Sequence, residues 1–258
     1  MARKMIDISV AIENDVPADP PVMDLKVNYM THKQTVGQLL PFFPGLSEAE
    51  LPGGEAWAIE QISLFTHNGT HLDAPYHFHS TMNNGQRAIT IDEVPLEWCF
   101  NRAVKLDFRD FEDGYVVSAQ DIKDELKRIG HELQALDIVV VNTSAGAAYG
   151  QPNYLAKGCG IGREATLYLL EHGVRITGTD AWSWDAPFIY TAQKYAETKD
   201  ASIIWEGHRA GMEIGYCHIE KLSNLEQLPD TGFMVSCFPV KIKGASAGWT
   251  RAVAIIED

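Results

Sequence analysis

The stretch His67–His79 reads HNGTHLDAPYHFH and holds four of the nine histidines of the chain. Three histidines and one aspartate in it occupy odd positions: His67, His71, Asp73 and His77. An extended backbone would present these four side chains on one face, because successive residues of a strand point to opposite sides. A helix would scatter them, and Gly69 and Pro75 both disfavour a helix interior. The sequence therefore predicts an extended segment with one polar face.

This segment must also curl if its polar side chains are to meet. Four residues of a straight strand span roughly 13 Å, whereas atoms that each lie about 2 Å from one cation are within roughly 4 Å of one another. Gly69 has access to backbone angles closed to other residues and Pro75 fixes its own φ, so we expect the bends at these two positions.

A metal ion would explain why so many polar groups share one face. A single histidine in a turn is usually an ordinary polar residue. Three imidazoles and a carboxylate are costly to bury together without a cation, since each needs a partner. We therefore predict a metal site here, with His79 beyond it as a structural or supporting residue.

Composition narrows the class of protein. With 258 residues, 45% of them hydrophobic, the chain can bury a substantial core. The net charge of −14 argues against nucleic acid or an anionic membrane surface as the main partner. No apolar stretch approaches the ~18 residues of a membrane span, and the four scattered cysteines form no C-x-x-C pair. We expect a cytoplasmic protein that binds a small molecule.

Hydrophobic patterning indicates alternating strands and helices. Seven short runs rich in Ile, Val, Phe and Ala are typical of strands: 5–10, 56–65, 102–108, 137–143, 174–179, 233–238 and 251–256. Helices are predicted at 118–129, where Ser118 and Asp121 form an N-terminal cap, and at 163–172. The alternation favours an α/β or α+β fold with a mixed sheet.

The domain organisation is expected to be simple. We predict one domain over residues 1–258, with an irregular Pro-rich excursion at about 15–55 that is either a surface loop or a lid over the site.

One competing catalytic motif lies near the C-terminus. The run GASAG at 244–248 matches the G-x-S-x-G elbow of serine hydrolases, but no histidine follows Ser246, so the order Ser, Asp, His cannot be completed. We interpret it as a glycine-rich turn. Trp182 and Trp184 follow a predicted strand, and we expect them to line a pocket for a flat cyclic substrate.

The histidine-rich stretch resembles the signature H-x-G-T-H-x-D-x-P-x-H of the cyclase-like metal-dependent hydrolases, which include bacterial kynurenine formamidase and isatin hydrolase. Residues 67–77 match every fixed position. Further similarity lies in MIDISVAI (5–12), RITGTDAWSWDAP (175–187) and KLSNLEQLP (221–229). The resemblance implies the cyclase-like fold, in which helices flank a mixed β-sheet.

The resemblance also implies roles for individual residues. The first two histidines and the aspartate of the signature hold a metal, which corresponds to His67, His71 and Asp73, and the last histidine, here His77, acts in acid/base chemistry. Two-metal relatives add a distant histidine and a glutamate twelve residues later.

His208 and Glu220 have that separation. Asp73 would then bridge the two ions. Nitrogen and oxygen ligands suit zinc and tolerate manganese, so we expect one or two such ions per chain, preferably zinc.

Two departures from the family pattern bear on the substrate. Trp182 and Ser183 replace a common Pro-Ser, and GASAGWTR replaces a C-terminal Ser-Gly turn. We expect a metal-dependent hydrolase that opens an amide, imide or lactone bond of a small cyclic or aromatic compound, assembled as a dimer or tetramer. The alternatives are an arylformamidase acting on N-formylkynurenine, a non-catalytic metal- or ligand-binding protein, and a metal-free serine esterase.

Overall fold

The computed structural model describes residues 3–257, which form two compact units. Within these residues the first unit comprises 3–12, Val16–Pro20 and 66–257, and the second comprises Glu13–Asp15 and Pro21–Phe65. The Pro-rich excursion falls mostly in the second unit.

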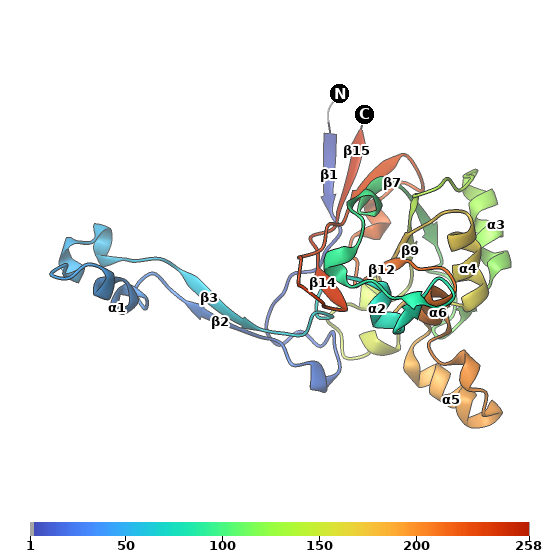
Figure 1. Cartoon of the computed structure of the whole chain (residues 1–258), viewed down its shortest axis with the longest axis horizontal. Helices are drawn as coiled ribbons and strands as arrows, with labels where there is room; N and C mark the ends of the chain where they lie inside the picture. Colours follow the sequence, from blue (N-terminus) through green and yellow to red (C-terminus); the bar gives the residue numbers. More distant parts are fainter. Residues whose placement is uncertain (1–2, 258) are drawn as a thin grey trace. The chain divides into compact units, whose positions relative to one another are not determined.

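A mixed β-sheet of nine strands forms the centre of the first unit (Figure 1). Its strands, in chain order, are β1 (Arg3–Asp7), β4 (His71–Asp73), β7 (Phe100–Asp107), β9 (Ile138–Asn142), β11 (Ile176–Thr179), β12 (Cys217–Glu220), β13 (Phe233–Ser236), β14 (Ala247–Trp249) and β15 (Val253–Glu257). Their spatial order is β1-β15-β13-β7-β9-β11-β12-β4-β14. The strands β7, β9, β11 and β12 run parallel, and the other neighbours pair antiparallel. The prediction of a mixed sheet is confirmed.

All seven predicted strands are present, six of them in this sheet and one, β3 (Ile59–Ser63), in the second unit. The seven predicted runs do not include β4, β12 or β14, although the segment that contains β4 was expected to be extended. Each has only three or four residues. Two of them also carry charged or imidazole side chains in place of an apolar alternation, so the usual strand signal is missing.

Two helices cover one face of the sheet: α3 (Ala119–Ile129) and α4 (Arg163–Glu171). The predicted cap of α3 is confirmed, because Ser118 Oγ accepts a hydrogen bond from the Asp121 N–H. Ile122 of α3 and Leu169 of α4 pack with Val139 of β9 in one buried cluster. Each fully buried side chain of this kind contributes about 1.5–3 kcal/mol.

The remaining elements are short or exposed. The first unit also contains α2 (Pro75–Phe78), α5 (Phe188–Thr198), α6 (Glu206–Arg209) and the two-residue strands β5 (Thr81–Met82), β6 (Gln86–Arg87), β8 (Val116–Val117) and β10 (Gly160–Ile161). No residue of α5 is buried. Among residues 3–257, no helix has the length and apolar character needed to cross a membrane, and all four cysteines are free and buried.

The second unit contains a two-stranded ribbon. Its strands β2 (Lys26–Met30) and β3 pair antiparallel, and α1 (Val36–Leu39) lies in the chain between them. The excursion expected to be irregular is therefore partly ordered as a hairpin. Proline disrupts a helix interior more strongly than it disrupts an edge strand, and residues 26–30 contain no proline. The prolines on either side of this run therefore leave a two-stranded ribbon possible.

Candidate metal centre

The segment from His67 to Phe78 bends where the sequence predicts. Gly69 has φ +62°, a backbone angle that favours glycine, and a Cβ there would lie only 3.1 Å from Ile12 Cγ1. The strand β4 then lasts only from His71 to Asp73, and Pro75 begins the single turn of α2. The chain is thus extended between two bends, which gathers its polar side chains.

Asp73 lies at the centre of these side chains and is fully buried. His67 Nδ1 is 2.9 Å and His71 Nε2 is 3.3 Å from Asp73 Oδ1. His77 Nε2 lies farther away, 3.8 Å from Asp73 Oδ2. The structure therefore brings together all four residues of the predicted polar face.

Strand pairing adds Glu220 and a histidine that the sequence analysis missed. The strand β12 pairs with β4 so that Glu220 lies opposite His71 and His218 lies opposite Asp73. Directly opposed residues project from the same face of a sheet. His71 Nε2 is 3.5 Å from Glu220 Oε2, and His218 Nε2 is 3.1 Å from Asp73 Oδ2 and 3.2 Å from Glu220 Oε1.

His208 reaches the same place from α6. Its Nε2 lies 3.7 Å from Glu220 Oε1. The Asp185 carboxylate accepts hydrogen bonds from the backbone N–H groups of Gly207 (2.7 Å) and His208 (3.1 Å), and also contacts His208 Nδ1. A carboxylate on the second ring nitrogen is the usual arrangement around a metal-binding histidine, because it fixes the tautomer and the ring orientation.

The buried polar atoms fit a divalent cation. Within residues 3–257, His71 Nε2 and both carboxylate oxygens of Asp73 are buried without a hydrogen bond, a costly state, even though nitrogens lie close to them. One bound cation would satisfy several of these atoms together. In the described part of the chain, two groups of residues have ligand atoms within 4.8 Å of one another: Asp73, His208, His218 and Glu220, and separately His67, Asp73 and His77.

The protonation states of the cluster follow from its burial and its charges. Burial lowers the pKa of His71, but the carboxylates of Asp73 and Glu220 outweigh it and raise that pKa to about 9. Burial raises the pKa of Asp73, but the surrounding imidazoles, His77 first, hold it well below its usual range. Burial also lowers the pKa of His77 to about 3, so this imidazole is neutral at pH 7.

The two tryptophans predicted to line a pocket have different surroundings. Trp184 is buried in the core, donates a hydrogen bond from Nε1 to Thr166 Oγ1 at 3.0 Å and stacks on His218. It packs behind the cluster, so the prediction of a pocket-lining role is kept for Trp182 alone. Trp182 is half-buried, and its Nε1 donates to Asp19 Oδ1 at 3.1 Å.

Sequence reasoning also missed Trp205 and Ser246. The half-buried Trp205 stacks on His208, with ring centroids 4.3 Å apart, and meets His77 edge-on at 5.0 Å. No pattern in the sequence pointed to it. Ser246 Oγ lies 3.0 Å from His67 Nε2, so the serine of the glycine-rich turn contacts a candidate ligand. His218 and Glu220 are separated by one residue, as His71 and Asp73 are, so both members of each pair point to the same side of a strand. This spacing was the sequence feature that could have indicated His218.

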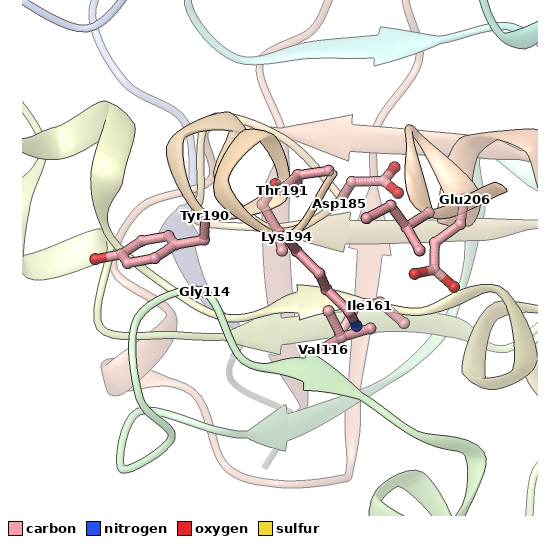
Figure 2. Close-up of a pocket in the computed structure, with 10 residues that line it drawn as sticks. Gly114, Val116, Ile161, Asp185, Tyr190, Thr191, Lys194 and Glu206 are labelled. Atoms are coloured by element: carbon pink, nitrogen blue, oxygen red, sulfur yellow. Dashed lines mark hydrogen bonds between the residues drawn. The ribbon is translucent and has the colours of Figure 1, made fainter. Parts of the chain in front are cut away.

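A small cavity borders the centre without containing it. It has a volume of about 40 Å³ and lies beside α5, where Tyr190, Lys194, Glu206 and Asp185 line it (Figure 2). None of the candidate metal ligands lines this cavity. Asp185 is therefore the link between the cavity and the cluster, through its contact with His208.

A family model and several solved structures match most of this chain. Residues 6–186 match the family model Cyclase, described as “Putative cyclase”. Isatin hydrolase A from Ralstonia solanacearum has a similar structure, with a TM-score of 0.77 and 21% identity over 99% of this chain and 92% of its own. Isatin hydrolase A from Labrenzia aggregata, bound to benzyl benzoate, gives a TM-score of 0.75 and 22% identity over 99% of this chain and 94% of its own.

A third solved structure is described as a potential metal-dependent hydrolase with cyclase activity. It gives a TM-score of 0.67 at 19% identity, and the alignment covers 100% of both chains. These likenesses show a shared fold, and the family match extends over more than half of the sequence, including the complete histidine signature. The chain therefore belongs to the cyclase family.

Proposed function

We propose that the protein is a metal-dependent hydrolase that opens an amide, imide or lactone bond of a small cyclic or aromatic carbonyl compound. The observation that carries this proposal is the convergence of imidazoles and Glu220 on the buried, unsatisfied carboxylate of Asp73. A divalent cation bound there, preferably zinc, would lower the pKa of its water from about 16 to about 7 and polarise a carbonyl oxygen.

His77 is the residue best suited to move protons. Its Nε2 lies 3.8 Å from Asp73 Oδ2, farther than the nitrogens of His67, His71 and His218 lie from this carboxylate. A neutral imidazole at this position can accept a proton from the attacking water and return it to the departing nitrogen or oxygen.

The exposed side of the cluster indicates where a substrate enters. The side chains of His67 and His77 are 19% and 24% exposed, whereas those of His71 and Asp73 are fully buried. Trp205 packs beside His77, so its indole can contact a flat ring placed over that histidine. The names of the structural relatives, isatin hydrolases and a metal-dependent hydrolase, support hydrolysis as the type of reaction.

The test is a substrate screen on protein of defined metal content. The chain is stripped with a chelator, reloaded with Zn²⁺ or Mn²⁺, and assayed against isatins, cyclic imides, lactones and formanilides. We expect turnover of a cyclic substrate that disappears on stripping and returns with metal. Preference for formanilides would instead identify an arylformamidase.

A single variant distinguishes metal-dependent hydrolysis from catalysis by a serine nucleophile. Ser246→Ala should remain active only with metal and lose at most about 10–100-fold in rate, because the Ser246 hydroxyl supports the candidate ligand His67 and is not itself a ligand. Full activity after exhaustive chelation, lost in Ser246→Ala, would establish a serine esterase. Metal-loaded protein that turns over none of these compounds would favour a binding protein.

A further inference from the structure

We propose that His218 is a protein ligand of a second cation, together with Asp73, His208 and Glu220. This inference rests on the metal centre of the proposed function and adds a residue to it. His218 lies outside the histidine signature and beyond residues 6–186, which the family model matches.

The histidine nitrogens around the Asp73 and Glu220 carboxylates fall into two groups, according to which carboxylate oxygen each nitrogen faces. Asp73 presents Oδ1 to His67 and His71, and presents Oδ2 to His218 and, at a longer distance, to His77.

Glu220 repeats this division. Its Oε2 faces His71, and its Oε1 faces His208 and His218. Each carboxylate therefore has one oxygen for each group, as expected if both bridge two cations. Asp73 Oδ2 and Glu220 Oε1 are the oxygens of the second group, and His218 Nε2 is the imidazole nitrogen that lies closest to them.

The distances within the second group suit one ion. The His218 Nε2 atom is 3.1 Å from Asp73 Oδ2 and 3.2 Å from Glu220 Oε1, and His208 Nε2 is 3.7 Å from the same glutamate oxygen. Atoms that each bind a cation at about 2 Å are separated by up to roughly 4 Å. The rings of His208 and His218 are nearly perpendicular, at 88°, so they approach a common point from different planes.

The packing around His218 holds its ring in this orientation. The ring stacks on Phe78 at 5.0 Å and on Trp184 at 6.1 Å, and its side chain is fully buried. Within residues 3–257, its Nδ1 is buried without a hydrogen bond. Nε2, which faces the carboxylates, is therefore the nitrogen through which this imidazole interacts.

Burial distinguishes the two groups chemically. All four residues of the second group are buried, and four protein ligands complete the tetrahedral set of a closed zinc site. The first group includes the partly exposed His67. The partly exposed ring of His77 lies 4.1 Å from that of His67, although its nearest oxygen on Asp73 is Oδ2. A cation held by the second group would therefore be enclosed between β4, β12 and α6, whereas the first group is the one open to substrate and water.

The test measures metal binding directly, without a substrate. Zn²⁺ titration of the stripped protein should give two sites in the wild type. We expect His218→Asn to weaken one of them by about 100-fold or more, since even residues that only support a ligand contribute about 10–100-fold. Asparagine can still donate a hydrogen bond to the carboxylates, so the variant separates ligation from hydrogen bonding.

A matched control uses another histidine beside an acid. His131 Nε2 lies 2.9 Å from Asp137 Oδ2, outside the centre, and His131→Asn should leave both zinc affinities unchanged. The Co²⁺-loaded wild type gives an independent count, because each bound histidine contributes one paramagnetically shifted N–H resonance. We expect four such resonances, from His67, His71, His208 and His218, and this count holds even if the variant does not fold.

The outcomes separate the two proposals. Three shifted resonances, or unchanged zinc affinities in His218→Asn, would overturn the role of His218 while metal-dependent turnover still supports the hydrolase. A wild type that binds no divalent cation would overturn both.

Discussion

Lys221 Nζ donates a hydrogen bond to the carbonyl oxygen of His67 at 2.6 Å, which ties the first candidate ligand to the residue that follows the last, Glu220. The Lys221 side chain is buried, and its ammonium also pairs with Asp19. Asp19 in turn accepts a hydrogen bond from Asn68 at 2.9 Å. The loop that carries His67 is thus fixed to the end of β12 by a buried ion pair.

This ion pair should be important for stability. We expect Lys221→Met to lower the free energy of unfolding by about 3–5 kcal/mol, because it leaves the Asp19 carboxylate without its cation. Urea denaturation measures the loss. Lys243→Met, at an exposed position, is the control and should change stability by less than about 0.5 kcal/mol. Equal stability of the two variants would contradict the prediction.

His77→Ala should separate catalysis from metal binding. We expect the variant to keep its metal and lose about 10²-fold or more in kcat, the size expected for lost general acid/base help. Metal analysis and steady-state kinetics on the same preparation measure both. His79→Ala, at the exposed neighbour, should match the wild type. Parallel loss of metal and rate would make His77 a ligand instead.

Asp185→Asn should weaken the metal site through His208. Asparagine offers only one carbonyl oxygen where the carboxylate of Asp185 now meets two backbone N–H groups and His208 Nδ1. We expect zinc affinity at one site to fall by about 10–100-fold. Asp200→Asn changes an exposed helix cap and should leave zinc binding intact. Identical titrations for both variants would show that Asp185 does not position the ligand.

The two tryptophans should respond differently to substitution. Trp184→Ala removes a core side chain and should lower stability by about 3–5 kcal/mol. Trp182→Ala, at a half-buried position, should change KM or substrate preference more than it changes the melting temperature. Thermal denaturation and kinetics of the pair decide this, and a Trp182→Ala variant with lowered stability but unaltered KM would assign Trp182 to structure.

Removing a ligand from the second group should change metal stoichiometry. We expect wild type to bind two cations and His208→Ala to bind one under identical loading, because a carboxylate cannot replace the lost imidazole and its geometry. Glu220→Ala should weaken both sites, because Glu220 presents one oxygen to each group of ligands. Metal analysis after gel filtration gives the count. A wild type that never exceeds one metal at saturating zinc or manganese would reduce both residues to supporting roles.

Two features were predictable because they depend on the backbone of one short segment. These are the shared face of His67, His71 and Asp73 and the bends at Gly69 and Pro75. His218 was not predictable, since its place opposite Asp73 depends on pairing between strands that are distant in the sequence. For Trp184 the error was the opposite one, because the sequence analysis expected a pocket-lining residue where the structure has a core residue. A large aromatic residue after a strand looks the same in sequence whether it lines a pocket or fills the core, and only packing on α4 through Thr166 decides.

The location of β4 determines when the centre can assemble. This strand lies between β12 and β14 in the sheet, yet its residues leave the ribosome long before either neighbour. A nascent chain that ends before Cys217 has His71 and Asp73 but neither flanking strand, and a chain that ends before Ala247 still lacks one edge partner. The complete ligand set is therefore expected to form only after the C-terminal strands are made, because β12 supplies His218 and Glu220 and β14 pairs with the other side of β4.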